Sequence, residues 1–155
     1  MSEDWGIKAA KRLQDQAEGK RQEDALVLQE RLIREEQGVA LWNAVRQFVK
    51  DKCDQMNTEL RSSSAVLAIG QSSELKVRLT PLGGGTPRDL QAKFKPTSGP
   101  DALTWSTSGH RVNPQQKGQY EIAIERGKAI FRTNLIHSDG PEEIAEKMLD
   151  ALLLE

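Results

Sequence analysis

The sequence predicts a single α+β domain in which a long N-terminal helix and a C-terminal helix cover the same face of an antiparallel sheet. Three patterns favour this fold. Apolar residues recur at helical spacing through residues 39–60, short alternating runs fill residues 65–136, and a second helical pattern closes the chain at residues 139–155. The chain has 155 residues, which suffice for one domain with a buried core and are too few for two large independent domains.

The first 60 residues are predicted to be helical. Their second half presents one apolar face, made of Leu41, Val45, Phe48, Val49, Cys53, Met56 and Leu60. No proline interrupts the chain from about Lys8 onward, so the helix is either continuous or kinked at Gly38, where glycine costs about 1 kcal/mol relative to alanine. We therefore expect a charged helical extension over residues 1–37 and a single α+β domain over residues 38–155.

The extension has few apolar residues, and no heptad register joins them into a long coiled coil. A continuous helix over residues 8–60 would be roughly 80 Å long at 1.5 Å per residue, whereas a compact chain of this length has a radius of gyration of about 15 Å. Such a helix must bend, extend beyond its domain or pack against another chain, which favours a homodimer. The candidate interaction residues are Leu13 and Ala17, Leu28 and Leu32, and Trp42, which meets either the sheet or a second chain.

A meander of five or six antiparallel strands is predicted after the helix. Six short runs carry a period of two and are separated by Gly, Pro or Ser clusters: AVLAIG, QSSELKVRLT, DLQAKFKP, ALTWST, GQYEIAIE and GKAIFRTNLI. The clearest hairpin spans residues 119–134 and turns at Arg126-Gly127. A two-residue turn would pair Glu121 with Arg132, Ile122 with Phe131 and Glu125 with Lys128.

The last element is predicted to be a helix that starts after Asp139. This residue would be the N-cap, and Glu142 would complete a capping box. The apolar face of the helix would consist of Ile144, Met148, Leu149 and Leu152. This face should pack on the same side of the sheet as residues 39–60.

Charge is distributed unevenly along the chain, although the net charge is only −1 and excludes a globally basic nucleic-acid binder. Residues 62–132 contain ten Lys and Arg against five Asp and Glu, whereas residues 139–155 contain one against six. Either the tail helix complements the sheet, or the sheet receives an anionic ligand. The candidate anion-binding residues are the outward cations of two neighbouring strands, Lys76, Arg78, Lys93 and Lys95. A solvated strand face is the alternative explanation of these charges.

No catalytic, cofactor-binding or metal-binding signature accompanies this organisation. The glycines at 83–85 lead into Thr-Pro-Arg-Asp and a strand rather than a phosphate-binding helix, so they indicate a hairpin connection in which Arg88 could still bind an anion. Neither His110 nor His137 has neighbours at metal-ligand spacing. The single cysteine, Cys53, lies on the apolar helical face and is expected to be a core residue. We assign no catalytic, cofactor or metal residue.

The sequence therefore favours a non-enzymatic protein-interaction or assembly module that forms a homodimer partly through its N-terminal helix. One alternative is a small-molecule binder or an unrecognised enzyme, with a cavity lined by Val49, Phe94, Trp105 and Phe131. A second is polyanion or nucleic-acid binding through the basic sheet face, although the sequence makes nucleic acid an improbable partner. No apolar stretch reaches the roughly 20 residues that span a bilayer, and no signal-peptide pattern opens the chain, so a cytoplasmic protein is expected.

Overall fold

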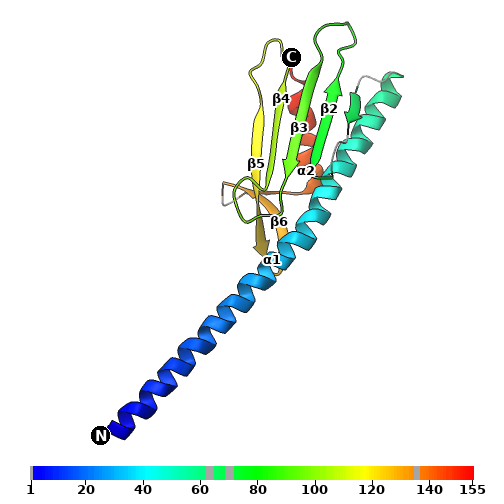
Figure 1. Cartoon of the computed structure of the whole chain (residues 1–155). Coiled ribbons are helices and arrows are strands. Elements are labelled where there is room, and N and C mark those ends of the chain that lie inside the picture. Colours follow the sequence, from blue (N-terminus) through cyan, green and yellow to red (C-terminus); the bar gives the residue numbers. More distant parts are fainter. Residues whose placement is uncertain (1, 62–64, 69–71, 135–136) are drawn as a thin grey trace. The chain divides into compact units, whose positions relative to one another are not determined.

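The computed structural model describes residues 2–61, 65–68, 72–134 and 137–155. The chain forms two compact units, Met1–Leu32 and Ile33–Glu155. The first unit is part of one helix, α1 (Ser2–Leu60), whose remaining residues belong to the second unit (Figure 1). The second unit contains the sheet and the C-terminal helix, α2 (Pro141–Leu153), which confirms the predicted α+β class. No helix in the described part of the chain is long and apolar enough to cross a membrane.

Helix α1 is continuous through Gly38, which lies against the sheet rather than at a kink. A Cβ atom at Gly38 would lie 2.9 Å from Ile122 Cδ1 and 3.6 Å from Phe94 Cζ. Glycine at this position therefore lets the helix backbone approach the sheet closely. Of the two predicted forms, kinked or continuous, the structure has the continuous one, because packing against the sheet accounts for the glycine.

Within the described residues, the sheet has seven strands in the order β1-β2-β3-β4-β5-β6-β7, and every neighbouring pair is antiparallel. Six strands correspond to the six predicted runs, and a short seventh strand was not predicted. The strands are β1 (Ala65–Ala68), β2 (Glu74–Leu79), β3 (Arg88–Phe94), β4 (Leu103–Ser108), β5 (Lys117–Glu125), β6 (Lys128–Thr133) and β7 (His137–Asp139).

The hairpin between β5 and β6 has the predicted register. The structure pairs Glu121 with Arg132, Ile122 with Phe131 and Glu125 with Lys128. The turn residues Arg126 and Gly127 have φ values of 51° and 74°, which matches the left-handed backbone of a two-residue type I′ turn.

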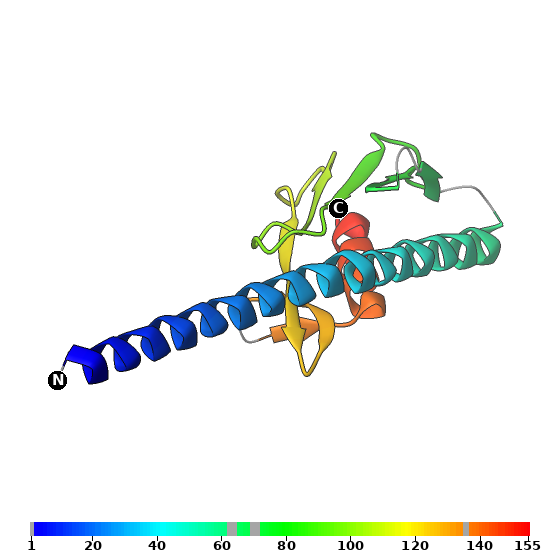
Figure 2. The same cartoon turned by 60° about the horizontal axis from the view of Figure 1, so that its bottom comes forward.

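Residues 33–60 of α1 and α2 lie on the same side of the sheet, as predicted, and the core fills the space between the layers (Figure 2). The Trp42 ring stacks on the Phe94 ring, with centroids 5.5 Å apart. Phe131 packs edge-on against Phe94 at 6.2 Å and also contacts Tyr120 at the same centroid separation. The core side chains of α2 are Ile144, Ala145, Met148 and Leu152. Because these side chains interdigitate, the helices and the sheet form one packed core.

The predicted N-cap of α2 is wrong. The N-cap residue is Gly140, it makes no side-chain capping bond, and Pro141 occupies the first helical turn, where its fixed φ suits the helix start. Asp139 is the last residue of β7 and its side chain is buried. Glu142 forms an ion pair with Lys52 of α1 at 3.3 Å. Because Asp139 occupies an inward-facing position of β7, its carboxylate lies in the interior and does not cap the first turn of α2.

Candidate functional site

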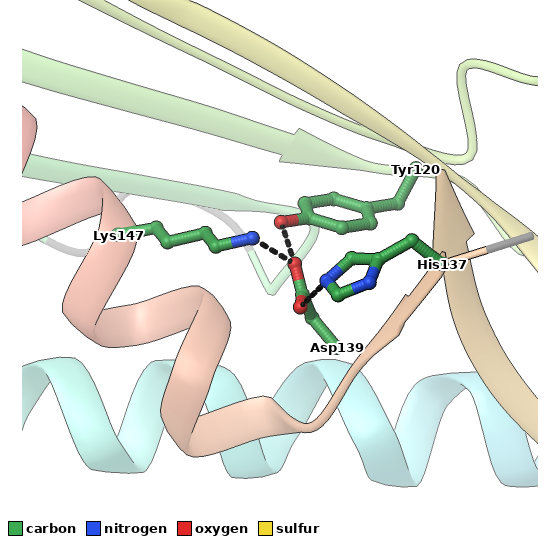
Figure 3. Close-up of polar contacts among 4 residues, drawn as sticks. All are labelled: Tyr120, His137, Asp139 and Lys147. Atoms are coloured by element: carbon green, nitrogen blue, oxygen red, sulfur yellow. Dashed lines mark hydrogen bonds and ion pairs between the residues drawn. The ribbon is translucent and has the colours of Figure 1, made fainter. Parts of the chain in front are cut away.

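The most concentrated group of buried polar contacts surrounds Asp139, whose side chain has no exposed surface (Figure 3). Its Oδ2 atom accepts a hydrogen bond from the Tyr120 hydroxyl at 2.6 Å and another from Lys147 Nζ at 2.6 Å. Its Oδ1 atom lies 2.8 Å from His137 Nε2. Because a carboxylate only accepts hydrogen bonds, His137 donates through Nε2 in this arrangement. The four residues come from β5, β7 and α2.

The electrostatics of this group stabilise an ionised Asp139 beside a protonated Tyr120. Burial raises the pKa of Asp139, but hydrogen bonds from Lys147, Tyr120 and His137 together with the Lys147 charge outweigh burial, so the pKa lies below its ordinary value. Burial and the hydrogen bond to Asp139 raise the pKa of Tyr120 well above its ordinary value. Both carboxylate oxygens are occupied and the tyrosine keeps its proton. Through the Asp139 carboxylate, the group joins three elements of the fold.

This group forms from residues that the sequence patterns had separated. Asp139 was expected at a helix terminus, Tyr120 lies 19 residues away from it in the sequence, and Lys147 carried no signal of its own. One sequence signal argues against Asp139 as the helix cap, namely the proline at position 141. Proline favours the first helical position, and a helix that begins at Pro141 has residue 140, not Asp139, as its N-cap.

The C-terminal end of α2 is held by Arg88, the first residue of β3, and by His110, which follows β4. His110 Nε2 donates to the carbonyl oxygen of Ala151 at 2.8 Å, and Arg88 Nη1 donates to those of Leu153, at 2.9 Å, and Leu154. The last turn of α2 contains no basic residue of its own. Arg88 and His110 therefore satisfy the free carbonyl groups that the helix end presents.

A surface hollow of about 530 Å³ lies next to this helix end. It is lined by the glycine loop at 83–85, by Arg88, His110 and Arg111, and by Glu155. The loop joins the antiparallel strands β2 and β3, as the sequence predicted. Arg88 already donates to α2 and an acidic residue shares the lining, so this hollow is a poor anion site.

The four predicted anion-binding residues are all exposed, and three of them lie on the neighbouring strands β2 and β3. Arg78 forms two hydrogen bonds with Asp89, at 2.9 and 3.4 Å, and Lys95, just beyond β3, pairs with Asp101 at 3.7 Å. In the described part of the chain, Lys76 and Lys93 form no ion pair. The structure thus brings these cations to one face but neutralises two of them.

The predicted interaction residues divide into two groups. Leu13, Leu28 and Leu32 are 66%, 55% and 54% exposed, and Ala17 is exposed as well. Trp42 is 1% exposed; its ring stacks on Phe94 and its indole nitrogen donates to the carbonyl oxygen of Ser72 at 2.8 Å. Of the two roles foreseen for Trp42, contact with the sheet or with a second chain, the structure shows contact with the sheet.

Helices α1 and α2 flank a small apolar hollow of about 200 Å³. Cys53 contributes to its lining, and Lys52 at its rim pairs with Glu142 and Glu146 at 3.3 and 3.2 Å. Burial raises the pKa of the Cys53 thiol to about 11, so this cysteine is a poor nucleophile at neutral pH.

Neither the metal-ligating residue types in the described structure nor comparison with known proteins indicates a function for the chain. The described residues contain no group of three or more His, Cys, Asp or Glu side chains that could hold a metal ion. Comparison of the chain with protein-family models, with curated proteins and with solved structures finds no match.

Proposed function

We propose that this chain is a non-enzymatic protein-interaction or assembly module that forms a homodimer through the first part of α1. The observation that carries the proposal is the compact unit Met1–Leu32, which consists of helix alone and nevertheless carries large apolar side chains. Those at least 54% exposed are Trp5, Ile7, Leu13, Leu26, Val27, Leu28 and Leu32. A single helix has no other element in its own unit against which to bury them.

Leu28 and Leu32 are the most suitable contact residues because they lie one helical turn apart on the same side of α1. Each side chain is slightly more than half exposed. Complete burial would contribute about 1–2 kcal/mol per leucine, from roughly 25 cal/mol per Å² of apolar surface. The four leucines of a symmetric dimer would therefore supply roughly 4–8 kcal/mol before the cost of association, which corresponds to weak binding. A dimer that persists at tens of micromolar protein therefore requires the other exposed apolar side chains of this unit to contribute as well.

The interior of the second unit favours an interaction function over small-molecule binding. Val49, Phe94 and Phe131 belong to the packed core and are at most 5% exposed, so they do not line an open ligand cavity. Trp105 packs at the edge of this core, and its ring occupies the space above Gly118. The Asp139 group likewise has no unoccupied carboxylate oxygen to offer a substrate.

Analytical ultracentrifugation of the full chain at tens of micromolar tests the proposal. The unmodified chain should sediment as a dimer, and a variant with Leu28→Glu and Leu32→Glu should be monomeric. Leu26→Glu is the matched control, because Leu26 is also 55% exposed but lies about 200° around the helix from Leu28. A monomeric unmodified chain would overturn the proposal, as would a dimer unaffected by the double substitution. Circular dichroism should show equal helix content in all three proteins. The cytoplasmic location remains a prediction, which imaging of the tagged chain would test.

A further inference from the structure

The outward face of strands β2 to β5 carries a cluster of lysines that the sequence patterns had only partly identified. Side chains alternate along each strand, and the register of the sheet aligns Lys76, Gln91, Ser106 and Lys117 in one row across the four strands. Lys93 lies on the same face, two residues from Gln91 along β3. All three lysines are exposed, whereas Gln91 and Ser106 between them are partly buried.

The cluster draws its cations from distant parts of the sequence. Neighbouring strands are about 4.8 Å apart, so the backbones at Lys76 and Lys117 are roughly 14 Å apart across three strand spacings. Lysine side chains are long enough to lean toward Gln91 and Ser106 from both sides. The three ammonium groups can therefore reach a centre of neutral hydrogen-bonding groups.

The acidic residues on this face leave the cluster positive. Asp89 is engaged by Arg78 through two hydrogen bonds. Glu74 lies opposite Lys93 in the register but forms no ion pair with it in the described structure. In the same described residues, Lys76 and Lys117 have no carboxylate partner. The lysines can therefore interact with an external anion.

The surface at this centre is hollowed. Two open hollows, of about 510 and 320 Å³, both have Gln91 and Ser106 in their lining. The first also includes Lys76, and the second includes Lys93 and Lys117. Because the hollows share two lining residues, they lie next to each other across the strands, and each has lysine in its lining; we refer to the two together as the trough.

We propose that this trough binds a linear polyphosphate chain through its phosphate oxygens. The described outward positions of the four strands hold cationic, acidic, amide and hydroxyl side chains and no aromatic ring on which a nucleobase could stack. Trp105 contributes to the lining of the second hollow, but it pairs with the buried Ala92 and packs against the core, so its ring lies on the core side of the sheet. A chain of phosphates without bases supplies the charge and the acceptor oxygens that lysine, glutamine and serine recognise. This site shares no residue with the proposed dimer contact on α1.

Fluorescence anisotropy with labelled inorganic polyphosphate and the full chain tests the site. Three lysine–phosphate contacts predict that log K falls with log salt concentration at a slope of about −2, from roughly 0.7 per phosphate contact on a flexible strand. A variant with Lys76→Gln, Lys93→Gln and Lys117→Gln should bind at least about tenfold more weakly and lose most of the salt dependence.

The matched control changes three exposed lysines that lie outside the trough, with Lys20→Gln, Lys50→Gln and Lys128→Gln. Lys50 pairs with Asp54, and Lys128 lies opposite Glu125. The control has the same net charge as the test variant and should bind nearly as tightly as the unmodified chain. An equal loss of affinity in both variants would mean that binding depends only on net charge, and this result would refute the proposed site. Absent or salt-independent binding by the unmodified chain would refute it as well. Tighter binding of single-stranded oligothymidylate than of polyphosphate of equal charge would overturn recognition by phosphates alone.

Discussion

Replacing Asp139 with alanine tests whether the buried carboxylate joins β5, β7 and α2. In the native chain this side chain accepts hydrogen bonds from Tyr120 and Lys147, both at 2.6 Å, and from His137 at 2.8 Å. Asp139→Ala removes all three contacts at once. It also leaves the Tyr120 hydroxyl without its acceptor, in a residue that is 4% exposed.

The expected loss follows from how well each donor can reach water. A hydrogen bond to a charged group contributes about 1.5–3 kcal/mol, and a buried hydroxyl left without a partner costs about 1–3 kcal/mol. The side chains of Lys147 and His137 are 49% and 62% exposed, so both can bind water instead and their pairs contribute little. Removing a buried charge also recovers its desolvation penalty. We expect Asp139→Ala to lower the free energy of unfolding by about 2–4 kcal/mol, mostly through Tyr120.

Urea unfolding followed by circular dichroism, at one protein concentration, measures this loss. A double-mutant cycle with Tyr120→Phe isolates the tyrosine contribution, because the double variant leaves no unpaired hydroxyl. The double variant should be more stable than the sum of the single effects predicts, by about 1–2 kcal/mol. Additive effects within about 0.5 kcal/mol would refute the reasoning, and so would a loss below about 0.5 kcal/mol for Asp139→Ala.

Two further predictions concern the helix–sheet contact and acid stability. Gly38→Val should destabilise the chain by about 1–3 kcal/mol, because its Cβ would lie 2.9 Å from Ile122 Cδ1, whereas Gly19→Val, with no atom within 4 Å, should leave the urea midpoint nearly unchanged. The pKa of Asp139 is lower in the folded chain, so its carboxylate stabilises the fold above the unfolded value of about 3.9, and this contribution is lost as pH falls through the folded pKa. Unfolding free energies measured from about pH 6 to pH 2 should therefore fall less steeply in Asp139→Asn than in the unmodified chain; parallel curves would contradict this assignment.

Local periodicity made much of the fold predictable. Apolar spacing located the second half of α1, and alternation located six strands, because each pattern depends on neighbours within a few residues. The register of the β5–β6 hairpin was predictable for the same reason, since a two-residue turn at Arg126-Gly127 allows little choice in how the strands pair. The seventh strand, at residues 137–139, was too short to show a period.

The candidate sites were less predictable because they depend on residues that only the sheet brings together. Lys76 and Lys93 could be assigned to one face from alternation along β2 and β3. Lys117 could not be added to them without knowing that β4 and β5 extend the same sheet in sequence order. Its inclusion moves the centre of the basic face from the β2–β3 pair toward Gln91 and Ser106.

The sequence by itself determined the kinds of elements in this protein, their order and which side of most of them is apolar, because the periods of helices and strands are local properties. Tertiary structure alone decided what Gly38, Trp42 and Asp139 do. Gly38 permits close contact with the sheet, Trp42 stacks on Phe94, and Asp139 joins three elements instead of capping a helix. Each of these roles depends on a neighbour far along the chain or on the direction in which a strand places a side chain. The spacing of adjacent residues encodes neither the distant neighbour nor that direction.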